Sequence, residues 1–313
     1  MTNPSRGGAR RGTPHATLGY HTFVADPIPI NVAGLLPNGE SHMFSPLTSR
    51  LIYGQHHAVL VDAPLTTDQA KALGDWIEAS GKRLTHIFVT HGHGDHWFTA
   101  NVLAERFGAQ VIASAGTIQQ MHNNVSVRDV FWDKLGPDQI PPAPVSAVTV
   151  PDNRFTLDGY DLVIVEVGHG DSDDNAVLHV PDLGLVVAGD PIYNGVHQYL
   201  GESAHGGRDA WRNTVETVKS LQPRWVVASH KDKNRDADAA RVIAQTRHYL
   251  DDADELLAAK DAPEEFFFAM LARWPDRLLG ATTLWAGTNA IYASRGRNNT
   301  DVLEDSLNGW FTP

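Results

Sequence analysis

The feature that most constrains this chain is a dense set of potential metal ligands placed directly after an apolar run. Residues 84–89 are apolar and rich in β-formers, and residues 91–96 read HGHGDH. Neutral imidazole and carboxylate groups are good ligands for borderline divalent metals such as zinc. Gly92 and Gly94 allow the backbone to turn so that neighbouring side chains converge. We therefore expect a buried strand that carries a metal-binding loop at its carboxyl end.

The rest of the chain predicts two β-rich halves, each with helices. The first half has expected strands at 49–53, 58–62, 84–89 and 110–113, and helices at 66–80 and from 97 to 107. After a proline-rich connector at 135–148, the second half has expected strands at 154–157, 161–167, 175–180, 185–188 and 224–228, and a helix at 208–221. Further helices are expected at 236–260, 263–274 and 277–293. This pattern is consistent with two sheets packed face to face and helices outside them.

Three later residues could join the first loop. His169, Asp190 and His230 each follow an apolar β-run. Taken one at a time they have ordinary interpretations, since a histidine after a strand is commonly structural and an aspartate before a proline commonly forms a turn. That they act together as ligands is implied by the family resemblance of the 91–96 segment.

The segment 91–96 resembles the HxHxDH motif of the metallo-β-lactamase superfamily. In that family the remaining ligands are a histidine after a later strand, an aspartate after the next hairpin and a histidine near the end of the core, and His169, Asp190 and His230 occur in this order. The resemblance spans about Ser49 to Asp232. It implies an α/β fold, a four-layer αββα sandwich with a C-terminal helical extension. We expect a disordered tail at 1–18, a catalytic core at 19–232 and a helical extension at 233–313 packed on the core.

The resemblance also implies a ligand set. One ion would be bound by His91, His93 and His169, and the second by Asp95, His96 and His230, with Asp190 bridging them. The expected cofactors are two divalent ions, with zinc first and iron or manganese as alternatives. A hydroxide shared by the two ions would attack an acyl carbonyl, and Asp95 would orient it or move a proton.

Two features bear on the substrate. The chain has no cysteine, which argues against the β-lactamases that use a cysteine ligand. Tyr193 lies three residues after Asp190 and resembles the tyrosine that holds the substrate carbonyl in acyl-homoserine lactonases of this fold, although it could equally pack behind the loop. The sequence therefore predicts a lactone or ester hydrolase. The alternatives are a thioesterase, a β-lactam or phosphodiester hydrolase, a non-heme iron oxidoreductase, or a metal-binding scaffold without catalysis.

The sequence also departs from the family pattern. Many members follow the third histidine with His-Thr-x-Gly-His/Ser, whereas here His169 precedes Gly170 and three acidic residues, Asp171, Asp173 and Asp174. If these acids face inward, they would disfavour strongly anionic substrates; if they face solvent, they form a polar loop. Asp62 either orients a metal-binding histidine or forms a turn, and His197 is a weaker site candidate.

The composition of the chain limits the kinds of partner that we expect. The net charge of −12 disfavours a nucleic-acid binder, which needs a basic face. No apolar run is long enough to cross a bilayer, and the Arg-rich N-terminus lacks the apolar stretch of a signal peptide. We expect a cytoplasmic enzyme with a small-molecule substrate and no membrane partner. Phe266, Phe267, Phe268 and Trp285 are expected in the core, with a pocket wall or a homodimer contact as alternatives.

Overall fold

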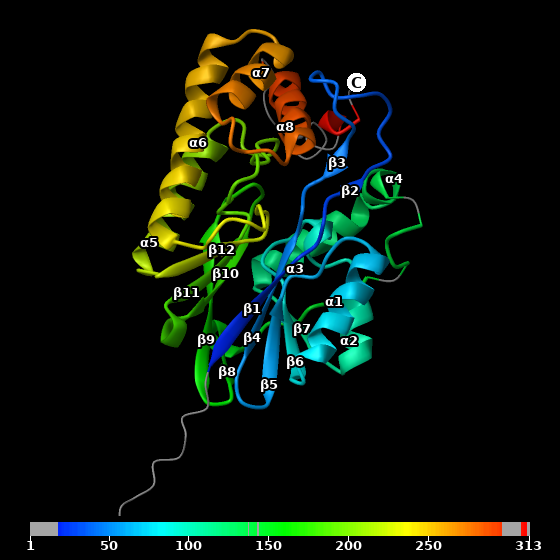
Figure 1. Cartoon of the computed structure of the whole chain (residues 1–313), viewed down its shortest axis with the longest axis vertical. Helices are drawn as coiled ribbons and strands as arrows, with labels where there is room; N and C mark the ends of the chain where they lie inside the picture. The colour runs from blue at the N-terminus through cyan, green and yellow to red at the C-terminus, as the bar shows by residue number, and fades with distance from the viewer. Residues whose placement is uncertain (1–17, 137, 143, 296–307, 312–313) are drawn as a thin grey trace, which may run out of the picture.

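The computed structural model describes residues 18–136, 138–142, 144–295 and 308–311, so most of the predicted tail at 1–18 lies outside the described residues. Two five-stranded sheets form its centre (Figure 1). The first has the order β1-β4-β5-β6-β7, and β5, β6 and β7 run parallel. Its strands are β1 (Gly19–Val24), β4 (Thr48–Tyr53), β5 (His57–Val61), β6 (Arg83–Phe88) and β7 (Gln110–Ile112).

The second sheet has the order β12-β11-β10-β9-β8. All its strand pairs are antiparallel except β11 with β12, which are joined through a helix and run parallel. Its strands are β8 (Arg154–Leu157), β9 (Tyr160–Gly168), β10 (Asn175–Val180), β11 (Leu185–Gly189) and β12 (Trp225–Ala228). A short ribbon of β2 (Ile28–Pro29) and β3 (Met43–Phe44) lies outside both sheets.

Strand β11 shows why the fold has four layers. Leu185 and Val187 belong to the hydrophobic cluster between the two sheets, whereas Val186 and Ala188 belong to the cluster under the helices. Successive side chains of a strand point to opposite faces, so an uninterrupted apolar strand is buried on both. The predicted αββα sandwich is confirmed.

The helices on the first sheet agree with the sequence-based predictions in part. Helix α1 (Thr67–Ala79) begins at the predicted position because Thr66 and Gln69 form a capping box. Helices α1 and α2 (Ala100–Phe107) were both expected. Helices α3 (Ala115–Ser126) and α4 (Trp132–Leu135) were not, because the segment 115–126 is largely polar and has weak apolar periodicity.

The other helices cover the second sheet and extend beyond it (Figure 1). They are α5 (Gly207–Ser220), α6 (Ala239–Ala259), α7 (Pro263–Arg273) and α8 (Ala281–Ser294). All four contribute to one hydrophobic cluster together with β11 and β12. Phe266, Phe267 and Trp285 are buried in it, and Phe268 is exposed.

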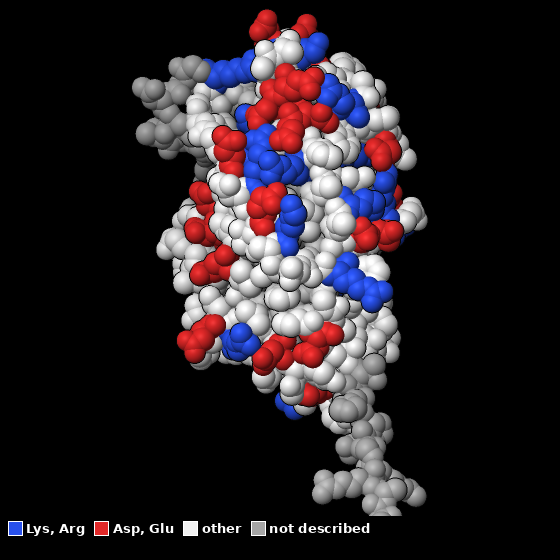
Figure 2. Space-filling model, turned by 90° about the vertical axis from the view of Figure 1, so that its left-hand side faces the viewer, with Lys and Arg blue, Asp and Glu red and all other residues white. Residues whose placement is uncertain are grey.

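Ion pairs join α5 to α6 at the surface. Arg212 contacts Asp251 at 2.8 Å, and Arg208 contacts Asp254 at 2.6 Å. Figure 2 shows acidic and basic side chains interspersed on the face it displays, rather than gathered by sign. This face does not carry the continuous basic patch that a nucleic-acid binder needs. Among the described residues, none of the helices is both long and apolar enough to cross a membrane.

Candidate metal centre

Histidine and aspartate side chains from four parts of the chain meet at one end of the sandwich. They come from the loop after β6, from the loop between β9 and β10, and from the carboxyl ends of β11 and β12. Part of the first loop is a 3₁₀ turn over Gly94–His96. A Cβ at Gly94 would overlap the Phe98 ring, so this position requires glycine. The sequence thus places the predicted ligand loop where the strands end.

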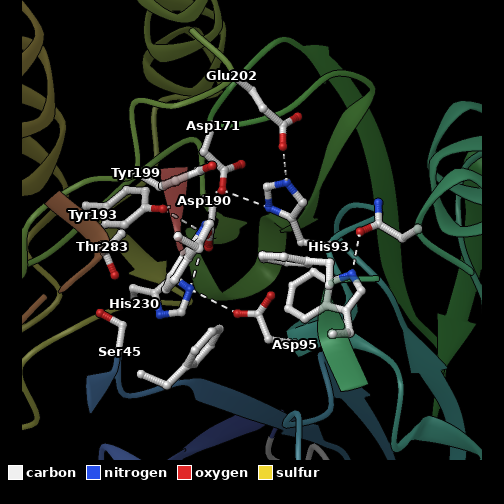
Figure 3. A pocket seen from close by; sticks show the side chains of 15 residues that line it. Ser45, His93, Asp95, Asp171, Asp190, Tyr193, Tyr199, Glu202, His230 and Thr283 are labelled. Carbon is white, nitrogen blue, oxygen red and sulfur yellow. Dashed lines mark hydrogen bonds and ion pairs between the residues drawn. The ribbon is translucent and has the colours of Figure 1, made fainter. Parts of the chain in front are cut away.

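The first group consists of His91, His93 and Asp171. One Asp171 carboxylate oxygen lies 3.1 Å from His93 Nδ1, and the other lies 3.8 Å from His91 Nε2. None of the three side chains is more than 12% exposed. Figure 3 shows the Asp171 carboxylate directed at the His93 ring.

The second group consists of Asp95, His96 and His230, with Asp190 beside it. Asp95 Oδ2 lies 3.3 Å from His96 Nε2 and 3.4 Å from His230 Nε2. Asp190 Oδ2 lies 3.3 Å from His230 Nε2 and 3.7 Å from His96 Nε2. Because His91, His96 and Asp190 also form a close group, Asp190 lies between the two sets. This is the position expected of a bridging ligand.

In each clustered histidine, the ring nitrogen that points away from the cluster contacts another group of the protein. The Nδ1 atoms of His96 and His230 lie 3.0 Å from Asp62 Oδ2 and from the Pro46 carbonyl oxygen, respectively. His91 Nδ1 lies 3.1 Å from Thr90 Oγ1. Such contacts fix the orientation of an imidazole and leave the other nitrogen for a metal.

In His93 the roles of the two ring nitrogens are the reverse of those in the other three histidines. Its Nε2 lies 3.0 Å from Glu202 Oε1, so Nδ1 is the nitrogen that faces Asp171. No pattern in the sequence singled out Glu202, which comes from the loop before α5. Asp62 takes the orienting role that the sequence left as one of two possibilities.

Unpartnered buried atoms indicate what the centre binds. His91 Nε2, His96 Nε2, Asp171 Oδ1 and Asp190 Oδ1 are all buried without a hydrogen-bond partner among the described residues. A buried polar atom without a partner is energetically costly. Four such atoms converging from imidazoles and carboxylates fit divalent cations, which would satisfy them together.

The charges in the centre support the same conclusion. Burial opposes protonation of His230, but Asp190 and Asp95 outweigh it and raise its pKa to about 10. Burial also opposes protonation of His93, and Asp171 and Glu202 outweigh it and raise its pKa well above the ordinary value. In the metal-free protein, protons therefore occupy positions that a cation would take, and metal binding would release them.

His169 is the one predicted ligand that the structure does not bring into these groups. Its Nδ1 lies 2.7 Å from Asp173 and its Nε2 lies 3.1 Å from Ser203 Oγ. Asp171, from the same loop at 169–174, lies beside His91 and His93. The expected place of His169 with these two histidines therefore disagrees with the geometry of the described residues.

The three acids after His169 have different positions. Asp171 is buried in the centre, whereas Asp173 has a side chain 72% exposed. The Asp174 carboxylate accepts a hydrogen bond from Gln120 Nε2 at 2.8 Å. The sequence left open whether these acids face the site or the solvent. In the structure, Asp171 is the one that faces the site.

A cavity opens above the cluster. Its wall is mainly aromatic, and Tyr193 reaches it with its hydroxyl, which donates a 2.9 Å hydrogen bond to Asp190 Oδ2 (Figure 3). Burial first, and then the Asp190 carboxylate, raise the Tyr193 pKa well above its ordinary value, so the hydroxyl stays a donor. The lining residues are Phe44, Ser45, His93, Asp95, Asn124, Phe131, Trp132, Asp171, Asp190, Tyr193, Tyr199, Glu202, His230, Thr283 and Trp310.

Several lining residues were not expected from the sequence. Phe44, Thr283 and Trp310 come from distant segments that no local pattern links to the site. His197 does not line the cavity and instead contacts the Tyr249 hydroxyl at 3.0 Å.

Comparisons with known proteins agree with this geometry. A family model described as the metallo-β-lactamase superfamily matches residues 47–230. A type 2 metallo-β-lactamase of Bacteroides fragilis is 26% identical over 196 residues, covering 60% of this chain and 70% of that protein. A hydroxyacylglutathione hydrolase of Rhizobium meliloti is 26% identical over 136 residues, 42% of each chain.

The fold is also shared with solved structures. A metallo-β-lactamase family protein of Thermus thermophilus superposes with a TM-score of 0.59 at 19% identity, covering 88% of this chain and 94% of that one. The superfamily model spans more than half of this chain, from Leu47, just before β4, to His230. The chain therefore belongs to the metallo-β-lactamase superfamily, a family of metal-dependent hydrolases.

Proposed function

We propose that this protein hydrolyses a neutral acyl substrate with an apolar substituent, such as a lactone or an ester, and that it does so with two divalent ions, zinc first. The observation that carries the proposal is the composition of the cavity wall. Six aromatic side chains line it, namely Phe44, Phe131, Trp132, Tyr193, Tyr199 and Trp310. Apolar walls with a few converging polar groups suit a small and largely apolar ligand.

Apart from the histidines, the charged side chains in the cavity wall are all acidic. Asp95, Asp171, Asp190 and Glu202 line the cavity, and none of its described lining residues is lysine or arginine. A substrate that carries a carboxylate or a phosphate would enter without a side-chain cation to pair with, at a cost in desolvation. This supports a neutral acyl group over a phosphodiester, a β-lactam with its carboxylate, or a glutathione thioester.

The proposal gives roles to two residues, Asp95 and Tyr193. Bound divalent ions would supply an acidified water and a Lewis acid for the carbonyl oxygen. Asp95 lies at the floor of the cavity, where its carboxylate can orient a nucleophilic water and accept its proton. The Tyr193 hydroxyl lies in the wall of the same cavity beside Asp190, where it can donate to a substrate oxygen as negative charge develops.

The test is a matched substrate panel with the purified protein. A neutral alkyl lactone and an ester are compared with a lactone of similar size that ends in a carboxylate, a thioester, a β-lactam and a phosphodiester. We expect turnover of the neutral acyl substrates, its loss with a chelator, and its return with zinc. Turnover of the phosphodiester or of the carboxylate-bearing substrates in preference to the neutral ones would overturn the substrate class.

Metal analysis of the same preparation tests the cofactor separately. Two zinc ions per chain would support the proposal. Two iron ions with oxygen consumption in place of hydrolysis would favour the oxidoreductase alternative, whose ligands have the same chemistry.

A further inference from the structure

We infer that Asp171, and not His169, completes the binding site of the first metal ion, so that each of the two ions is held by two imidazoles and one carboxylate. This inference rests on the metal centre of the proposed function. It concerns which side chains form that centre, and it departs from the ligand set that the sequence predicted.

The position of the Asp171 carboxylate supports this inference. Its two oxygens face the two histidines of the first group, 3.1 Å from His93 Nδ1 and 3.8 Å from His91 Nε2. The Asp171 side chain is 2% exposed, and its Oδ1 has no hydrogen-bond partner among the described residues. A buried carboxylate oxygen without a donor, aimed at an unpartnered imidazole nitrogen, is the arrangement left by a metal ligand pair.

Both ring nitrogens of His169 have partners within the protein. Asp173 engages its Nδ1 and Ser203 engages its Nε2. The Ser203 hydroxyl also donates to the Gly170 carbonyl oxygen at 3.1 Å, so the contact is part of a local network. A metal bound at Nε2 would have to displace Ser203, and His169 belongs to none of the close ligand groups found among the described residues.

The shape of the loop at 169–174 also supports the inference. Gly168 has a φ of +91°, which favours glycine, and the Gly170 amide donates to the Ser172 carbonyl oxygen at 2.8 Å. The buried Asn175 amide donates to the same carbonyl at 2.7 Å. These bonds fix the turn between His169 and Ser172 and hold Asp171 on its inner side.

Glu202 completes the geometry of the first site. Its carboxylate engages His93 Nε2 at 3.0 Å and so leaves Nδ1, the nitrogen nearer the backbone, to face Asp171. Each metal group then contains one histidine whose outer nitrogen meets a carboxylate, Glu202 for His93 and Asp62 for His96. Glu202 is thus a positioning residue for the first ion.

The ligand exchange changes the charge of the centre. Asp95, Asp171 and Asp190 contribute three negative charges against four positive charges from two divalent ions. With a histidine in the place of Asp171, only two negative charges would stand against the four. The additional carboxylate makes the centre harder as a ligand set and less attractive to an anionic substrate.

The experiment compares three alanine variants by metal content. Asp171→Ala, His169→Ala and the control Asp173→Ala are stripped of metal, reloaded with zinc and dialysed, and the bound zinc per chain is measured. We expect two ions in the wild type, in His169→Ala and in Asp173→Ala, and one in Asp171→Ala. Retention of two ions in Asp171→Ala with loss of one in His169→Ala would overturn the inference.

Cobalt spectroscopy gives a readout that is independent of activity. The cobalt-loaded wild type and Asp171→His are compared, since a histidine there restores a ligand of the other type. We expect Asp171→His to bind two ions with a shifted visible absorption spectrum, and His169→Ala to keep the wild-type spectrum. A spectrum changed in His169→Ala and unchanged in Asp171→His would contradict the assignment.

Folding and the wild-type metal content separate the possible failures. Circular dichroism of each metal-free variant checks that Asp171→Ala is folded, and Asp171→Asn, which has the same size, is measured if it is not. A wild type that binds no metal would overturn the proposed function itself. A wild type with two ions whose Asp171→Ala variant also keeps two would overturn the ligand assignment alone.

Discussion

Asp62 and Ser229 join the two sheets beneath the metal centre. Asp62 follows β5 in the first sheet, Ser229 follows β12 in the second, and the Ser229 hydroxyl donates a 2.8 Å hydrogen bond to Asp62 Oδ2. Asp62 Oδ2 also lies 3.0 Å from His96 Nδ1, and Ser229 precedes His230 in the chain. One fully buried carboxylate therefore contacts the second sheet and orients the His96 ring at the same time.

Replacement of Asp62 should weaken metal binding without touching a ligand. Asp62 has a φ of +60°, which asparagine tolerates, so Asp62→Asn removes the charge with little backbone strain. We expect zinc affinity to fall by about 10- to 100-fold, as for other residues that orient metal-binding histidines. A competition titration with a chromophoric chelator measures it. Ser229→Ala is the control, since it leaves the His96 contact in place, and equal effects of the two variants would refute an orienting role.

Tyr193→Phe should lower turnover and spare the metals. The hydroxyl reaches the cavity and contacts Asp190, while the ring packs 5.7 Å from the His230 ring, a contact that phenylalanine retains. Loss of one donor to a developing oxyanion costs about 100- to 1,000-fold in kcat. The check is kcat on a neutral lactone together with zinc content. An unchanged kcat would remove Tyr193 from the catalytic machinery.

Removal of the metals should destabilise the whole sandwich. The ions would satisfy buried atoms from both sheets, and a ligand that binds only the folded state adds about 2.7 kcal/mol at 100 times its Kd. For a chain of this size that corresponds to a Tm shift of roughly 4 °C. Scanning calorimetry with and without a chelator measures the shift. An identical Tm in both conditions would mean that no ion links the sheets.

At the other end of the sandwich, Asp158 predicts a pH dependence. Burial would raise its pKa, but hydrogen bonds from the His56 and His57 amides and the contact with the His57 ring lower the Asp158 pKa to about 2, against 3.8 ordinarily. A depressed carboxylate pKa stabilises the fold above the unfolded value, and this stability is lost as the pH falls from about 4 toward 2.

Asp158→Asn should therefore cost about 1–3 kcal/mol at pH 7, and less as the pH falls below 4. Urea unfolding of the metal-free protein at pH 7 and pH 3 gives both values. Asp152→Asn is the control, because Asp152 is an exposed aspartate with a similar φ of +52°. A penalty for Asp158→Asn that is the same at both pH values would show that the charge is not responsible.

The sequence by itself determined the sandwich and most of the metal centre. Strands β5, β10, β11 and β12 are largely apolar runs, and the segment 91–96 holds its candidate ligands within six residues, so local pattern was sufficient for them. Strand β1 mixes polar and apolar residues and was not expected. Asp190 and His230 also follow apolar runs, and the family resemblance assigned them as ligands. Helix α3 was not predicted because its polar segment has little apolar periodicity. The contacts that stabilise it come from distant parts of the chain.

Only the tertiary structure decided between His169 and Asp171. Both lie in one short loop, both are metal-binding residue types, and the family pattern favours the histidine. The outcome depends on Ser203 and Asp173, which engage the two nitrogens of His169, and on Asn175, which braces the turn that directs Asp171 inward. Glu202, Phe44 and Trp310 likewise reach the cavity from segments far apart in the chain. A side chain's direction is set by what packs against it, and that information is spread over the whole fold.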